Sequence, residues 1–197
     1  MWTLPNILTL SRIPLLFCIV GLLFMDGRWL MTFTFLLFIA GSITDWLDGY
    51  LARSLNQITI FGKLMDALVD KVFVVGIFVG MLASPKPGMP DWSVYCVLLI
   101  LSREFLITGL RLVAASRGLV LAAEKAGKYK TASQMGAIGA LLAGEALHYD
   151  FGLATDLVEK VYWAGIGLFV AATVLTVISG MLYLTKYWSV FEDPTQS

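Results

Sequence analysis

The chain has 197 residues, of which 58% are hydrophobic and only 14% charged, and its mean hydropathy is +0.81. This composition excludes an ordinary soluble domain, which is about half apolar and about a quarter charged, and it indicates a membrane protein. The 14 basic and 14 acidic residues cancel, so no net charge attracts nucleic acid. We therefore expect no nucleic-acid partner.

Six segments are long and apolar enough for membrane spans, each of which needs about 20 residues. In chain order they cover residues 7–25, 29–53, 61–83, 92–115, 131–147 and 161–184. The longer connections are a Pro-rich loop at 84–90, a basic connector at 117–130 and an acidic loop at 150–159. The pattern predicts an all-α integral membrane protein with six transmembrane helices. Residues 1–190 would form one domain, and residues 191–197 a short polar tail.

Positive charge is concentrated in the connections on one side of these spans. The basic residues there are Arg53 and Lys63 around the second connection, and Arg117, Lys125, Lys128 and Lys130 in the fourth. Cytosolic loops of membrane proteins carry an excess of Lys and Arg. We therefore expect a multi-pass protein of the cytoplasmic (inner) membrane with both termini in the cytosol.

Four carboxylates interrupt the second and third spans. Asp45 and Asp48 are three residues apart, and Asp66 and Asp70 are four apart, so each pair shares one helix face. Charged residues within spans are costly and usually functional. Carboxylates without His or Cys favour hard cations such as Mg²⁺ or Mn²⁺. We expect the four acids to meet and to hold two such ions, an arrangement that can clamp a phosphoryl group during its transfer.

The residues between the two acid pairs suit a phosphate-containing ligand. Gly49 removes a side chain where a nucleotide or diphosphate would approach the backbone, and Arg53 offers a forked cation for phosphate. An acid not needed for metal binding can accept a proton from an attacking alcohol. A cation-coupled transporter is the alternative, because acids within spans also mark ion pathways. Against a transporter, the chain has no paired Gly- or Pro-interrupted spans and no inverted repeat.

The stretch Asp45-x2-Asp48-Gly49-x2-Ala52-Arg53-x8-Gly62-x3-Asp66-x3-Asp70 resembles the signature of the CDP-alcohol phosphotransferase family at every fixed position. The resemblance implies a six-helix membrane enzyme, usually a homodimer, that transfers a phosphatidyl or related group from a CDP-linked donor to an alcohol and releases CMP. It also implies roles for single residues. The metals would be bound by Asp45, Asp48, Asp66 and Asp70, the base would be Asp70, and the CDP site would include Asp45, Gly49, Ala52 and Arg53.

Four further stretches resemble the phosphatidylglycerophosphate synthases within that family. They are residues 5–12 (PNILTLSR), 61–71 (FGKLMDALVDK), 102–111 (SREFLITGLR) and 127–135 (GKYKTASQM). This resemblance implies CDP-diacylglycerol as the donor and glycerol 3-phosphate as the acceptor. Serine, inositol phosphate or phosphatidylglycerol is the alternative acceptor. Ala67 stands where many members have proline, and we expect a straighter helix there rather than lost activity.

An acceptor phosphate needs cations near the acids. The candidates are Arg103, Arg111, Lys128 and Lys130, followed by Lys63 and Lys71. Arg111, Lys128 and Lys130 would equally suit contact with anionic lipid headgroups. Arg103 could instead pair with Glu104 or Asp70, and Lys71, next to Asp70, could tune the charge of the acids. Asn6, Thr9 and Arg12 recur every three residues at the start of the first span. They either cap the cytidine site or mark the membrane interface.

Overall fold

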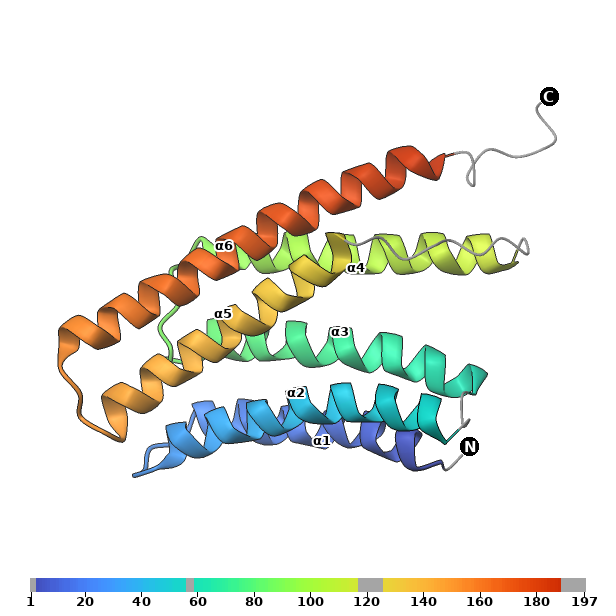
Figure 1. The fold of residues 1–197 in the computed structure, drawn as a ribbon. Helices are drawn as coiled ribbons and strands as arrows, with labels where there is room; N and C mark the ends of the chain where they lie inside the picture. The colour runs from blue at the N-terminus through green and yellow to red at the C-terminus, as the bar shows by residue number, and fades with distance from the viewer. Residues whose placement is uncertain (1–2, 56–58, 117–125, 189–197) are drawn as a thin grey trace.

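The computed structural model describes residues 3–55, 59–116 and 126–188, and the regular structure within these ranges is helical. The helices are α1 (Leu4–Leu23), α2 (Leu30–Ser54), α3 (Ile60–Ala83), α4 (Ser93–Ser116), α5 (Ala126–Tyr149) and α6 (Thr155–Lys186). They run alternately in opposite directions, so the start of α1, the start of α3 and the end of α6 lie at one end of the bundle (Figure 1). The predicted all-α fold of six long helices is confirmed.

The predicted spans match α1 to α4 to within about three residues and are too short for the last two helices. α5 begins at Ala126 rather than at residue 131, and α6 begins at Thr155 rather than at residue 161. The basic connector and the acidic loop are therefore partly helical. Hydropathy marks only the apolar part of a helix, whereas an acidic residue such as Asp156 favours a helix start through the helix dipole. The predicted tail at 191–197 lies outside the described residues.

The helices pack in two groups that meet mainly where α2 lies against α5 and α3 against α4. α1 contacts α2 and α3 in the first group, and α6 contacts α5 and α4 in the second. Between the groups, α2 contacts α5, and α3 contacts both α4 and α5 (Figure 1).

α1 and α3 approach each other closely because α3 has two glycines in the interface. A Cβ on Gly76 would lie 2.7 Å from a methyl carbon of Leu16, and one on Gly80 would lie 2.8 Å from a methyl carbon of Val20. Small residues at helix interfaces allow this close contact in membrane proteins.

Apolar side chains fill the space between the two groups and also cover the outside. Phe38, Phe73, Phe78 and Phe169 are almost fully buried, and the ring centroids of Phe78 and Phe169 are 4.9 Å apart. Outward-facing apolar residues include Phe17, which is 71% exposed. By length and composition, α1, α2 and α6 are the helices of the described part that are long and apolar enough to cross a membrane. Such an outer surface suits lipid better than water.

At the end of the bundle opposite the acids, hydrogen bonds between polar residues connect distant parts of the chain. Asp150, after α5, accepts hydrogen bonds from the backbone N–H of Trp29 at 2.9 Å and of Thr32 at 2.6 Å. It thereby caps the start of α2 from a distant part of the chain. Lys86, in the α3–α4 loop, donates to Asp26, and this hydrogen bond raises the pKa of the Lys86 ammonium group. The position of α2 is thus held at the end away from its acids.

Candidate active site

Three of the four acids converge where the end of α2 lies against the start of α3. Asp45 and Asp48 belong to α2 and Asp66 to α3. One carboxylate oxygen from each lies within 4.8 Å of the other two, and we call these three residues the acid group. Asp70, one turn further along α3, lines a cavity of about 290 Å³ together with the acid group. It is not part of the close set of oxygens, so its contact with metal stays a prediction.

The acid group has the chemistry of a hard-cation site. Asp48 is buried, whereas the side chains of Asp45 and Asp66 are 39% and 56% exposed. The group is therefore backed by protein on one side and open to the cavity on the other. Its ligand atoms are carboxylate oxygens, which suit Mg²⁺ or Mn²⁺ better than zinc. These residues fit a divalent metal ion.

α1 supplies two side chains whose role the sequence left open. The Arg12 guanidinium donates to Asp45 and lies 3.3 Å from Asp66 and 3.5 Å from Asp48. The Thr9 hydroxyl donates to the same Asp48 oxygen at 2.8 Å. The three-residue spacing in the sequence shows that Thr9 and Arg12 share a helix face, but it does not show which helix that face meets. The structure places that face against the acids.

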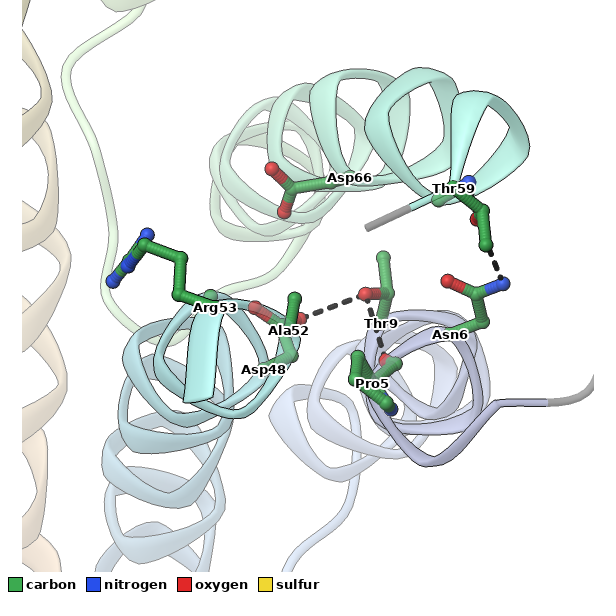
Figure 2. Close-up of a pocket in the computed structure, with 10 residues that line it drawn as sticks. Pro5, Asn6, Thr9, Asp48, Ala52, Arg53, Thr59 and Asp66 are labelled. Carbon is green, nitrogen blue, oxygen red and sulfur yellow. Dashed lines mark hydrogen bonds between the residues drawn. The ribbon is translucent and has the colours of Figure 1, made fainter. Parts of the chain in front are cut away.

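A cavity of about 260 Å³ adjoins the acid group on the side of α1 (Figure 2). Its lining consists of Pro5, Asn6, Thr9, Asp48, Gly49, Ala52, Arg53, Thr59, Gly62 and Asp66. The three small or basic residues predicted for the CDP site, Gly49, Ala52 and Arg53, all lie in this lining. Asn6 and Thr9 also lie there, so of the two roles considered for them the pocket is favoured over the membrane interface.

The start of α3 forms one wall of this pocket. Thr59 caps α3 by accepting the backbone N–H of Gly62 at 2.9 Å, and the Asn6 amide donates to the Thr59 hydroxyl at 3.5 Å. The wall needs glycine at position 62, because a Cβ there would lie 2.4 Å from the Asn6 side-chain oxygen. Thr59 was not among the predicted site residues. The sequence feature that could have indicated Thr59 is a threonine, a preferred helix N-cap residue, three residues before Gly62 of the signature.

Comparison with known proteins decides the family. The sequence model described as CDP-alcohol phosphatidyltransferase matches residues 2–191. The chain belongs to the CDP-alcohol phosphatidyltransferase family. Among named relatives, a CDP-diacylglycerol–glycerol-3-phosphate 3-phosphatidyltransferase of Bacillus subtilis is 40% identical over 95% of this chain and 96% of its own length. That of Cereibacter sphaeroides is 32% identical over 98% of each chain. A cardiolipin synthase (CMP-forming) of Oryza sativa is 31% identical over 95% of this chain and 58% of its own.

In this phosphatidyltransferase family member, two of the predicted acceptor-binding cations meet at a buried carboxylate. Lys130 of α5 is 7% exposed and donates to Glu104 of α4. Arg103 donates to the same Glu104 oxygen at 3.2 Å. Two cations share one carboxylate, so the cluster keeps one positive charge in excess.

The other predicted cations are less directly connected to the acids. Arg111 donates from Nε to the Tyr183 hydroxyl at 3.2 Å, and its guanidinium lies 5.3 Å from the centroid of the same ring. Lys71 donates to a backbone carbonyl one turn earlier in its own helix, at 2.6 Å. The side chains of Lys63 and Lys128 lie outside the described part of the structure. Lys130 and Arg103 are thus paired with Glu104, and an acceptor role for any of these cations stays a prediction.

Proposed function

We propose that this protein transfers the phosphatidyl group of CDP-diacylglycerol to glycerol 3-phosphate, giving phosphatidylglycerophosphate and CMP, in anionic phospholipid synthesis. The observation that carries the proposal is the acid group itself, which borders a cavity lined by four further fixed residues of the family signature, Gly49, Ala52, Arg53 and Gly62. The Bacillus subtilis and Cereibacter sphaeroides relatives bear the name of this activity.

The acid group and the adjoining cavity suit the CDP diphosphate of the donor. Asp45, Asp48 and Asp66 would hold two divalent cations, Mg²⁺ or Mn²⁺, with Asp70 as a further ligand. When bound, such ions neutralise the diphosphate and the charge that develops on departing CMP. Arg53 adds a guanidinium suited to a phosphate oxygen. Its neighbour in the pocket lining, Gly49, leaves the backbone of α2 accessible to the nucleotide.

Asp70 acts as the base in this proposal. It takes the proton from the 1-hydroxyl of glycerol 3-phosphate. The oxygen then bonds to the phosphorus that carries diacylglycerol, and the bond from that phosphorus to the CMP oxygen breaks. Asp70 lines the cavity beside Asp66. The acceptor phosphate would bind Lys130 and Arg103, with Arg111 and Lys128 as further candidates, because a phosphate dianion suits their excess positive charge.

Phosphatidylglycerol is the second acceptor to consider, since the rice relative is named cardiolipin synthase (CMP-forming). That reaction uses the same kind of site with a lipid alcohol in place of a soluble one. The buried Lys130 and the largely buried Arg103 favour glycerol 3-phosphate, because its terminal phosphate carries about two charges and the phosphodiester of phosphatidylglycerol carries one. Serine and inositol phosphate are further alternatives, and membership of a transferase family argues against a transporter.

We further infer a homodimer in the cytoplasmic membrane, with the acid-bearing end of the bundle facing the cytosol. The distribution of Lys and Arg supports this orientation, because Arg53 near the end of α2 and Lys130 near the start of α5 both lie at this end. A cytosolic site would also let the soluble acceptor enter and CMP leave without crossing the membrane.

The test is CMP release from CDP-diacylglycerol by the purified protein in detergent with Mg²⁺. Glycerol 3-phosphate, phosphatidylglycerol, serine and inositol phosphate are supplied separately, and mass spectrometry identifies the lipid product. We expect release with glycerol 3-phosphate, loss of release with EDTA, and recovery with added Mg²⁺ or Mn²⁺. A different productive acceptor would overturn the substrate assignment. Undiminished release in EDTA would overturn the metal assignment, and no release with any acceptor would overturn the enzymatic one.

A further inference from the structure

Among the described residues, Arg12 is the basic residue that forms ion pairs with the acid group. Its guanidinium contacts Asp45 and Asp48 of α2 and Asp66 of α3, so a residue of α1 joins two other helices. Arg12 is 1% exposed, whereas Asp45 and Asp66 remain partly open to the cavity. The guanidinium therefore supports the acid group from inside the protein, away from the open side.

One guanidinium does not balance three carboxylates. Three negative charges and one positive charge leave a formal charge of −2 on this cluster, equal and opposite to one divalent cation. Carboxylates held within 4.8 Å of one another repel strongly where water is partly excluded. Arg12 reduces this repulsion in the absence of metal and leaves enough negative charge for a divalent ion to bind.

The hydrogen bonding of Arg12 is incomplete. Its Nε is buried and has no partner among the described residues. Its contacts with Asp66 and Asp48, at 3.3 and 3.5 Å, are longer than the roughly 2.7–2.9 Å of a strong charge-assisted hydrogen bond. An arginine that serves as a permanent structural link normally has its buried donors satisfied. Two of the three contacts are therefore weak enough to be exchanged.

We propose that Arg12 is the counterion of the metal-free acid group and that metal binding takes over carboxylate oxygens that Arg12 holds. The inference rests on the proposed metal-dependent function and adds two roles for Arg12. It keeps acids of two helices together before the metal arrives, and it limits metal affinity by competing for the same oxygens.

A positioning role for Arg12 makes the opposite prediction. If Arg12 only oriented the carboxylates as ligands, its loss would weaken metal binding by about 10- to 100-fold, as is usual for groups that orient metal ligands. If Arg12 competes with the metal, its loss strengthens metal binding. The sign of the change in metal affinity therefore separates the two roles.

The experiment measures Mn²⁺ binding to the full chain in detergent without substrates, using the electron paramagnetic resonance signal of free Mn²⁺. For Arg12→Gln we expect a Kd about tenfold lower than that of the wild type, because a contacting positive charge is removed. Thermal unfolding should show a lower Tm for Arg12→Gln without metal and a larger rise in Tm on adding Mn²⁺. Unchanged or weaker Mn²⁺ binding overturns the proposal.

Three further variants make the result specific. Thr9→Val removes a hydrogen bond to Asp48 from an uncharged donor on α1, the helix that also carries Arg12. It should therefore not tighten Mn²⁺ binding. Arg53→Gln removes an equal charge from the cavity lining and should lower the Kd less than Arg12→Gln does. Arg12→Lys keeps the charge but cannot span three carboxylates, and it should tighten binding even if Arg12→Gln fails to fold. Equal tightening by Thr9→Val or Arg53→Gln overturns the proposal.

The wild-type measurement separates failure of this inference from failure of the proposed function. If the wild type binds no Mn²⁺, the metal site itself is wrong. If the wild type binds Mn²⁺ and Arg12→Gln does not bind it more tightly, the metal site stands and the role of Arg12 is wrong; where Arg12→Gln does not fold, Arg12→Lys decides in its place.

Discussion

Gly62→Ala tests whether the contact between α1 and the start of α3 shapes the donor pocket. The new Cβ would lie 2.4 Å from the Asn6 side-chain oxygen and 2.9 Å from the Thr59 hydroxyl. Both separations are too short for carbon and oxygen, so a neighbour must move. Thr59 is held by its cap on α3, whereas the Asn6 side chain can rotate. We therefore expect Asn6 to leave its present position in the pocket wall.

The effect on stability should be modest, because the changes partly offset one another. Alanine in place of glycine stabilises a helix by about 1 kcal/mol. The new Cβ, 2.9 Å from the Thr59 hydroxyl, weakens the cap without displacing Thr59 and destabilises the protein by about 1 kcal/mol, and a poor rotamer of Asn6 adds about 1 kcal/mol. The net loss of about 1 kcal/mol lowers the Tm by about 2–4 °C for a chain of this length.

Donor binding should change more than stability. The displaced Asn6 either enters the cavity of about 260 Å³ or leaves a polar group of the wall without its partner. A lost buried hydrogen bond corresponds to about 1–3 kcal/mol, so we expect the KM for CDP-diacylglycerol to rise by about tenfold, which is about 1.4 kcal/mol. The KM for the acceptor should stay the same, because its proposed cations lie on α4 and α5.

The assay combines initial rates of CMP release at varied CDP-diacylglycerol with thermal unfolding followed by tryptophan fluorescence. Gly109→Ala is the matched control, because a Cβ at this position of α4 meets no atom within 4 Å. It should leave the donor KM unchanged and the Tm equal or higher. A wild-type donor KM in Gly62→Ala would refute the reasoning, since the pocket wall would then be unimportant for the donor.

Three further predictions concern the base, the acceptor and the far end of the bundle. Asp70→Asn should lower kcat by at least about 100-fold while equilibrium binding of CDP-diacylglycerol persists; wild-type turnover would show that another group takes the proton. Lys130→Met should raise the KM for glycerol 3-phosphate by about tenfold or more with little change in the KM for CDP-diacylglycerol. Equal rises in both KM values would indicate that Lys130 serves mainly to neutralise Glu104. Asp150→Ala removes the cap of α2 and should lower the Tm by about 2–4 °C with both KM values unchanged; an altered KM would show that this contact also positions the acids.

The helices could be predicted from the sequence because their signals are local. Apolar runs mark the spans, and breakers such as the Pro-rich loop at 84–90 separate them. The starts of α5 and α6 were predicted several residues too late, because the first turns of both helices are polar and hydropathy does not distinguish a polar helical turn from a loop. In α6 the helix begins at Thr155, with Asp156 in its first turn.

The acid group could be predicted because helical spacing shows which residues share a face, and a short connection forces α2 and α3 to be neighbours. Arg12 lies 33 residues before Asp45 and on a helix whose rotation the sequence does not fix. Its position among the acids could therefore not be derived from spacing. The pairing of Lys130 with Glu104, 26 residues apart, likewise depends on how α4 and α5 lie after the connector at 117–125. Such contacts are set by helix packing, which the pattern of a single helix does not encode.

The division of the site between two helix groups bears on how acceptor choice can vary within one family. The proposed donor and metal residues lie on α1, α2 and α3, whereas Arg103 and Lys130 lie on α4 and α5. Asp70, the proposed base, belongs to α3 in the first group. We therefore expect a change confined to α4 and α5 to alter the accepted alcohol while donor binding is kept.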